Sequence, residues 1–291
     1  MRPMQLRRSW LFVGAADKNA ILTSYDSGAD VCIQEFEDFC LPELRHEARQ
    51  MMPDVLSDWR ARKIVATVRI NPLEDPDGLR DLDAAMRAGA DAILLPKANT
   101  TEQITFLQKH INEMEKQCGK TVSSTKIIPN IEQARGLINA TDILSSSTQI
   151  AGALVASEDM VVSLNAPRKK NSEILNHVRR VFHIACCSVG ITSIDMPYTF
   201  TDDEGVKLQT MLAKDIGMLA KSTVNASHCK IINEILTPNE REVETAAEIV
   251  SAFEKGRGAG EGQVIHKGTK IEVPIYLNAK QTIERFEALS V

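Results

Sequence analysis

Two acidic residues, Glu132 and Asp159, are the clearest candidates for metal binding. Each follows a short apolar segment, at 126–128 and 150–155, where we expect a buried strand. Neighbouring strands lie about 4.8 Å apart, so carboxylates at their ends can share one ion with oxygen bonds of about 2.0–2.1 Å, as Mg²⁺ prefers. No His or Cys accompanies the pair, which argues against zinc. We therefore predict a Mg²⁺ site that could also take Mn²⁺.

The same two carboxylates could instead be ordinary first-turn residues of helices that Asn130 and Ser157 cap. Arg69 favours the metal-site interpretation, because helix capping does not explain why a residue of opposite charge should lie at the same strand ends as the two carboxylates.

Arg69 ends another predicted strand, within the segment 67–72. Its guanidinium is a planar, bidentate partner for a carboxylate or a developing enolate oxygen. The alternative is a structural ion pair with Glu37 or Asp38, and both roles can hold together. Lys97, after the next strand, is as well suited to a salt bridge as to a ligand contact.

These residues need a scaffold that brings strand ends together. Eight apolar segments alternate with amphipathic stretches, which predicts parallel β-α-β units. Strands are expected at 10–13, 31–33, 64–70, 92–95, 126–128, 150–155, 191–194 and 223–224, and helices at 17–27, 42–59, 78–88, 102–117, 132–140, 172–187 and 204–218. We predict an α/β fold, a TIM (β/α)8 barrel with a C-terminal helical extension. A doubly wound sheet is the alternative, but no GxGxxG or GxxxxGK[ST] follows a strand.

A β/α barrel places its active site at the C-terminal ends of the strands. Charged residues follow six consecutive predicted strands, which is more than solvation of a loop rim requires. They are Glu35, Glu37, Asp38, Arg69, Lys97, Glu132, Glu158, Asp159 and Asp195.

Composition excludes several other classes of protein. A formal net charge of −5 creates no field that would attract nucleic acid or anionic lipid. The six cysteines show no CxxC pair or disulfide framework, which suits a reducing compartment. The apolar run 10–13 is too short for a signal peptide or a membrane span. We therefore expect a cytoplasmic protein with no nucleic-acid or membrane partner.

The C-terminal part differs in composition from the barrel. Helices are expected near 227–236 and 240–255, followed by a glycine-rich segment, 256–262, that we predict to be a flexible linker. We accordingly divide the chain into a (β/α)8 barrel domain, 1–236, and a helical extension and tail, 237–291, that we expect to pack on a neighbouring subunit.

Six motifs in order resemble the HpcH/HpaI aldolase/citrate lyase superfamily, in particular the citrate lyase β-subunit and malyl-CoA or citramalyl-CoA lyase type. The resemblance covers nearly the whole chain. The motifs are RSWLFV at 8–13, EFEDF at 35–39 followed by Pro42, VRIN at 68–71, LPK at 95–97, IPNIE at 128–132 and SED at 157–159, and the tail segment 271–274 is similar to the family's Met-Ile-Asp-x-Pro.

The resemblance implies a Mg²⁺-dependent carbon–carbon lyase that cleaves a 3-hydroxyacyl-CoA thioester into a 2-oxo acid and an acyl-CoA. It implies that Glu132 and Asp159 bind Mg²⁺ and that Arg69 steadies an enolate or carbonyl oxygen. It further implies roles for Glu37 and Asp38 beside Arg69 or metal-bound water, and for Arg8 and Lys18 near the phosphates of coenzyme A. A homotrimer or hexamer is expected, in which Glu272 stands where the family has an Asp acting from a neighbouring subunit.

Two rival functions are kept open. Related CoA-free 2-oxo acid aldolases place a His directly after the Glu that corresponds to Glu37 in the motif at 35–39, whereas this chain has Asp38 there. A non-catalytic, citrate-lyase-like assembly subunit is the other alternative. It is kept open by departures from the family pattern at Gly14, Glu35, the segment 220–226 and Glu272.

Overall fold

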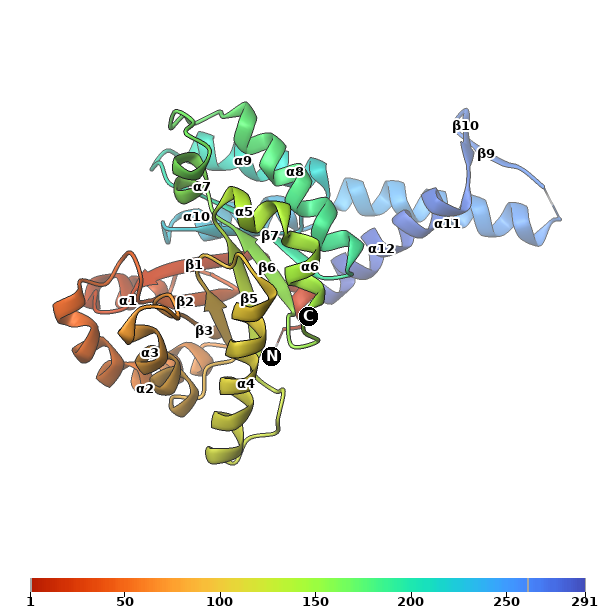
Figure 1. Cartoon of the computed structure of the whole chain (residues 1–291). Coiled ribbons are helices and arrows are strands. Elements are labelled where there is room, and N and C mark those ends of the chain that lie inside the picture. The colour runs from red at the N-terminus through yellow and green to blue at the C-terminus, as the bar shows by residue number, and fades with distance from the viewer. Residues whose placement is uncertain (1, 261, 291) are drawn as a thin grey trace. The chain divides into compact units, whose positions relative to one another are not determined.

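The computed structural model describes residues 2–260 and 262–290. Its barrel consists of eight parallel strands (Figure 1). They are β1 (Ser9–Gly14), β2 (Val31–Glu35), β3 (Val65–Arg69), β4 (Ala92–Leu95), β5 (Lys126–Ile131), β6 (Gly152–Val155), β7 (Thr192–Tyr198) and β8 (Ala220–Thr223). Each strand pairs with the next, and β1 also pairs with β8, so the sheet is closed. This confirms the TIM-barrel prediction and excludes a doubly wound sheet, which would have open edges.

The helices of the barrel follow the strands in the expected alternation. They are α1 (Lys18–Ser24), α2 (Arg45–Ala61), α3 (Pro76–Arg87), α4 (Thr101–Gln117), α5 (Ala134–Ile138), α6 (Ala140–Ser145), α7 (Glu158–Ser163), α8 (Glu173–Ser188), α9 (Asp203–Ile216) and α10 (His228–Leu236), with short 3₁₀ turns η1 (Met4–Leu6) and η2 (Pro42–Leu44). Asp17, Asp75, Thr100, Ser172 and Asp202 cap five of them through their side chains.

Alternation along the strands produces two apolar layers. One set of side chains, which includes Trp10, Ile33 and Leu94, packs together as a separate cluster. The other set, which includes Leu11, Cys32 and Ile93, packs in one cluster with side chains of the helices. Successive strand residues point to opposite faces, so we assign the first cluster to the barrel interior and the second to the layer between barrel and helices.

Two predicted elements are corrected. The helix expected at 132–140 is two short helices that start only at Ala134. The last strand is Ala220–Thr223, earlier than the predicted 223–224. Its start was missed because Lys221 and Ser222 look polar, yet both are fully buried. Burial is possible because the Lys221 ammonium contacts the carboxylate of Asp195 at 2.6 Å.

The chain divides into two compact units between Asn233 and Glu234. The second unit contains α11 (Glu240–Gly258), a hairpin of β9 (Val264–His266) and β10 (Thr269–Ile271), and α12 (Val273–Ser290). The predicted linker 256–262 is therefore wrong over its first three residues, which end α11. Glu261, in the same segment, lies outside the described residues. The hairpin was not predicted. Packing of 237–291 on a neighbouring subunit stays a prediction.

No helix in the ranges that the structure describes is long and apolar enough to cross a membrane.

Candidate active site at the carboxyl ends of the strands

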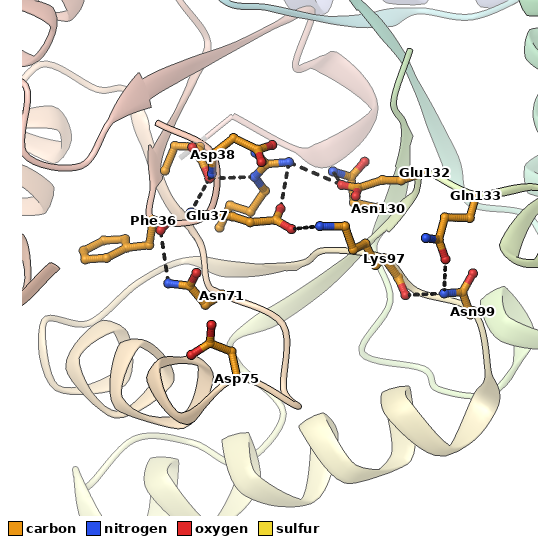
Figure 2. Close-up of polar contacts among 12 residues, drawn as sticks. Phe36, Glu37, Asp38, Asn71, Asp75, Lys97, Asn99, Asn130, Glu132 and Gln133 are labelled. Carbon is orange, nitrogen blue, oxygen red and sulfur yellow. Dashed lines mark hydrogen bonds and ion pairs between the residues drawn. The ribbon is translucent and has the colours of Figure 1, made fainter. Parts of the chain in front are cut away.

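Arg69, the last residue of β3, lies at the centre of the predicted site. Its guanidinium is almost completely buried and faces four carboxylates. Nε is 2.8 Å from Glu35, Nη2 is 2.6 Å from Asp38, and Nη1 is 3.2 Å from Glu37 and 3.3 Å from Glu132. Figure 2 shows Glu37 and Asp38, from the loop after β2, converging with Glu132, which follows β5. The structure thus brings together four of the residues singled out from the sequence.

Glu35, which the sequence placed among the charged residues at the strand ends without a specific role, is also a member of this group. It ends β2 in register with Arg69 and is fully buried. Its carboxylate accepts hydrogen bonds from the backbone amides of Glu37 at 2.6 Å, Asp38 at 3.3 Å and Phe39 at 2.5 Å. Glu35 therefore holds the loop after β2 in the shape that directs Glu37 and Asp38 to Arg69. Its position at a strand end next to Arg69 was the signal that could have found it.

Glu132 follows β5 directly and is fully buried. Its Oε1 accepts a hydrogen bond from the side-chain amide of Asn130, and among the described residues its Oε2 has no hydrogen-bond partner. The carbonyl oxygen of Asn130, Oδ1, is likewise buried and unpartnered within the described chain. Burial raises the pKa of Glu132 to about 8; Arg69 opposes this shift, and repulsion by Glu37 and Asp159 adds to it.

Asp159 lies in the first turn of α7, half-buried, on the wall of a cavity of about 280 Å³. Arg69, Asn130 and Asp38 line the same cavity. The capping alternative is not supported: the Ser157 side chain makes no capping hydrogen bond to α7, and Asn130 lies inside β5. Asp159 is close enough to Glu132 for its charge to affect the pKa of Glu132.

The donor atoms of this cavity suit a hard cation. No cluster of three or more His, Cys, Asp or Glu with metal-ligating geometry occurs in the described part of the chain. The two carboxylates predicted to bind the metal are Asp159, on the cavity wall, and Glu132, which is buried directly after β5. A buried carboxylate oxygen without a partner is costly unless something pairs with it. Mg²⁺ is commonly held by one or two carboxylates and completes its octahedron with water and substrate oxygens, so these residues fit it.

Lys97 reaches into the same group from the loop after β4. Its Nζ is 2.5 Å from Glu37 Oε1, and its backbone has a left-handed φ of 49° that few non-glycine residues adopt. Burial acts to lower the pKa of Lys97, but the contact with Glu37 raises it overall. Lys97 thus forms the salt bridge that the sequence suggested (Figure 2).

Asp195 does not belong to this site, contrary to the prediction that it stands past the end of β7. It lies inside β7, fully buried, where Arg179 contacts it at 2.5 Å and Lys221 at 2.6 Å. Arg179 comes from α8, so the carboxylate faces the helix layer.

The two residues expected near coenzyme A phosphates lie at different ends of the barrel. Lys18 begins α1, just after β1, and its exposed ammonium is 3.0 Å from Glu47. Arg8 precedes β1 and donates hydrogen bonds to Asp30, 2.9 Å from Nε. All strands run parallel, so Arg8 lies at the end opposite Glu132, and the structure does not bring it to the cavity. Its phosphate role stays a prediction, outside the site proposed below.

Glu272 lies between β10 and α12, in the second unit. Its side chain is exposed and 3.5 Å from Lys270. Its role in a neighbouring subunit stays a prediction.

Comparisons with known proteins agree with this architecture. Residues 8–226 match the HpcH/HpaI aldolase/citrate lyase family. The citrate lyase subunit beta of Haemophilus influenzae is 30% identical over 97% of both chains. An L-malyl-CoA/beta-methylmalyl-CoA lyase of Cereibacter sphaeroides is 27% identical over 91% of this chain and 89% of its own.

A crystal structure of the protein CitE from Mycobacterium tuberculosis, in complex with magnesium, acetoacetate and coenzyme A, superposes with a TM-score of 0.78 at 22% identity. The superposition covers 96% of this chain and 98% of that one. The chain belongs to the HpcH/HpaI aldolase/citrate lyase family and is a carbon–carbon lyase similar to the citrate lyase β subunit.

Proposed function

We propose that the protein cleaves a 3-hydroxyacyl-CoA thioester of the malyl, citramalyl or citryl type into a 2-oxo acid and an acyl-CoA, with Mg²⁺ as cofactor. The observation that carries the proposal is the buried, unpartnered Oε2 of Glu132, near Asp159 and beside Arg69. The malyl-CoA lyase relative and the CitE complex with magnesium and coenzyme A support the choice of cofactor and thioester.

Glu132 and Asp159 would hold the metal ion. When bound, Mg²⁺ would supply Lewis-acid stabilisation for the hydroxyl oxygen of the acid fragment, which gains negative charge as its proton leaves, before the carbon–carbon bond breaks. The rest of the site consists of groups already in place in this chain.

Arg69 is placed to stabilise negative charge on the acid fragment. It lines the cavity, and Glu35, Glu37 and Asp38 hold its guanidinium in one orientation. Donors fixed in advance lose no reorganisation energy during the reaction, so their stabilisation falls on the transition state. Glu37, held by Lys97 as well, is a positioning residue in this scheme.

Cleavage also requires two proton movements. The hydroxyl proton leaves its oxygen, the carbon–carbon bond breaks, and its electron pair passes to the carbon next to the thioester, which then takes up a proton. Asp38 lies on the cavity wall with half its side chain exposed and could accept the first proton. Glu272 of a neighbouring copy in a trimer or hexamer is the proposed source of the second.

A non-catalytic assembly role is the less favoured alternative. It would leave the buried, unpartnered Glu132 oxygen and the cluster of four carboxylates around Arg69 without an explanation.

A panel of malyl-, citramalyl- and citryl-CoA, assayed with Mg²⁺, with Mn²⁺ and with a chelator, tests the proposal. At least one thioester should be cleaved, and chelation should abolish the activity. Asp159→Ala should lose Mg²⁺ binding in calorimetry while its melting temperature stays near that of the wild type, because Asp159 is half-buried in the first turn of α7 at the cavity wall. Full activity in chelator, or unchanged metal affinity of the variant, would refute the proposed site.

A further inference from the structure

The cavity of about 280 Å³ beside Asp159, where we propose that the acid fragment binds, has a mostly apolar wall. Its apolar members come from five separate segments of the barrel and are Phe12, Phe39, Leu154, Ala156, Pro197 and Val224. Among the described residues that line this cavity, Arg69 is the single basic one. Its guanidinium already faces four carboxylates, and in the proposed function it also faces the acid-fragment oxygens at the metal site, so it has little capacity left for a second carboxylate of the ligand.

The remaining polar groups of the cavity are acidic, are already hydrogen-bonded or, like Asn130 Oδ1, can only accept a hydrogen bond. Asp38, Glu158 and Asp159 contribute carboxylates. The Ser157 hydroxyl donates to the Pro197 carbonyl at 3.4 Å. The Thr199 hydroxyl donates to Glu158, and the Asn130 amide donates to Glu132.

We infer that the acid released at this site is a 2-oxo monocarboxylic acid with a small apolar or absent substituent, and that the Glu158–Arg168 pair excludes acids with a second carboxylate. The inference rests on the proposed function, since it takes the first carboxylate and the oxo group to lie at the metal site. A second carboxylate would be desolvated against apolar walls and carboxylates, with no cation to pair with it, which is an effective means of rejecting a ligand.

Arg168 is the cation that could reverse this selectivity. It follows α7, and Glu158 holds its Nε at 2.9 Å. Its guanidinium also donates to Thr199 at 3.0 Å and lies 4.2 Å from the centre of the Phe200 ring. Arg168 lines a neighbouring cavity, whereas Glu158 and Thr199 line both cavities. Glu158 therefore neutralises Arg168 at the boundary between the two cavities.

Binding of two small acids to the Mg²⁺-loaded protein, measured by calorimetry, tests this inference. Pyruvate represents the monocarboxylates and freshly dissolved oxaloacetate the dicarboxylates. We expect wild-type protein to bind pyruvate at least about tenfold more tightly than oxaloacetate, a tenfold ratio being what one unpaired group readily produces. In Glu158→Gln, Arg168 loses its carboxylate partner and can pair with the second carboxylate of oxaloacetate. Oxaloacetate should therefore bind more tightly, and the ratio of pyruvate affinity to oxaloacetate affinity should fall.

Two further variants identify the group responsible. The double variant Glu158→Gln with Arg168→Gln should return to the wild-type preference, because the released cation is gone. Glu204→Gln removes a carboxylate from the exposed Lys207–Glu204 pair on α9 and should leave the ratio unchanged.

The outcomes separate the inference from the proposed function. Oxaloacetate binding as tightly as pyruvate to the wild type, no binding of either acid, or no effect of Glu158→Gln on the ratio would overturn the inference. If the acids bind in the expected order but none of the three thioesters is cleaved, the selectivity stands and the proposed reaction fails.

Discussion

Arg69 neutralises a group of carboxylates that could not otherwise share one buried site. Burial acts against its charged form, but Glu35, Glu132 and Glu37 raise the pKa of Arg69 above its ordinary value. The sequence left two roles open for this residue, an ion pair with the strand-two acids and a contact with the substrate. The geometry shows the ion pairs and also places the guanidinium on the cavity wall, so both roles are compatible.

Arg69→Lys tests the catalytic role at the residue scale. Lysine keeps the charge but loses the planar, multidentate geometry. We expect kcat/KM for the cleaved thioester to fall by about 10²–10³-fold, roughly 3–4 kcal/mol of transition-state stabilisation. Steady-state kinetics at saturating Mg²⁺, with the melting temperature measured in parallel, provides the readout.

Arg179→Lys is the matched control. Arg179 is equally buried and ion-paired, but its partner Asp195 faces the helix layer. This variant should lower the melting temperature without a comparable loss of kcat/KM. If both variants lose activity only in proportion to stability, Arg69 has a structural role alone.

At the scale of elements, one glutamate of helix α4 forms hydrogen bonds with the loop that leads into strand β5. Glu115, in the last turns of α4, is buried and accepts hydrogen bonds from the amides of Ser123 and Thr125, both at 2.6 Å, and from the Ser124 hydroxyl at 2.9 Å. Burial acts to raise the pKa of Glu115, but these hydrogen bonds lower it below its ordinary value of 4.5. Glu115 thereby fixes the entry into β5, the strand that carries Asn130 and leads to Glu132.

Glu115→Gln should destabilise the protein by about 1.5–3 kcal/mol near pH 7, the usual value of hydrogen bonds to a charged group. The folded-state pKa is depressed, so the unfolded state binds more protons as the pH falls, and the contribution is lost below pH 4.5. Urea unfolding between pH 3 and pH 7 should show the difference between wild type and variant shrinking below pH 4.5. A difference that is constant with pH would contradict this account.

At the scale of the whole molecule, the second unit places a carboxylate, Glu272, at the start of α12 and exposed to solvent. The family resemblance predicts that this carboxylate completes the site of a neighbouring subunit. Glutamate is one methylene longer than the family's aspartate, so it retains the group while changing its reach. General acid or base action requires hydrogen-bond distance, so the prediction concerns assembly as much as chemistry.

Mixing Glu272→Gln chains with Asp159→Ala chains tests this prediction. Each homo-oligomer should be nearly inactive, but mixed oligomers should regain activity where an intact metal site meets an intact tail. Mixing two preparations of Asp159→Ala is the control and should restore nothing. If mass-tagged subunits exchange and no activity returns, the tail does not act in trans.

The sequence by itself determined the parallel β-α-β units and most of the charged rim, and it favoured a barrel over a doubly wound sheet because no phosphate-binding glycine motif follows a strand. The apolar segments alternate with amphipathic ones at a period that only parallel β-α-β units satisfy, and strand ends in such a fold meet at one face. Arg69, Glu132 and Asp159 could therefore be placed at one rim without coordinates. Polar segments and very short ones escaped this method: β8 contains a buried lysine, and β9 and β10 are three residues each.

Only the tertiary structure decided which rim residues face the cavity. Asp195 looked equivalent to Glu132 in the sequence, but Arg179 of α8 and Lys221 of β8 hold it in the helix layer. Glu35 was recognised as one of the charged residues at the strand ends but received no role, yet it accepts hydrogen bonds from three backbone amides and organises the loop after β2. The physical reason is that a side chain's direction depends on sheet register and on partners supplied by distant segments, and local patterns contain neither.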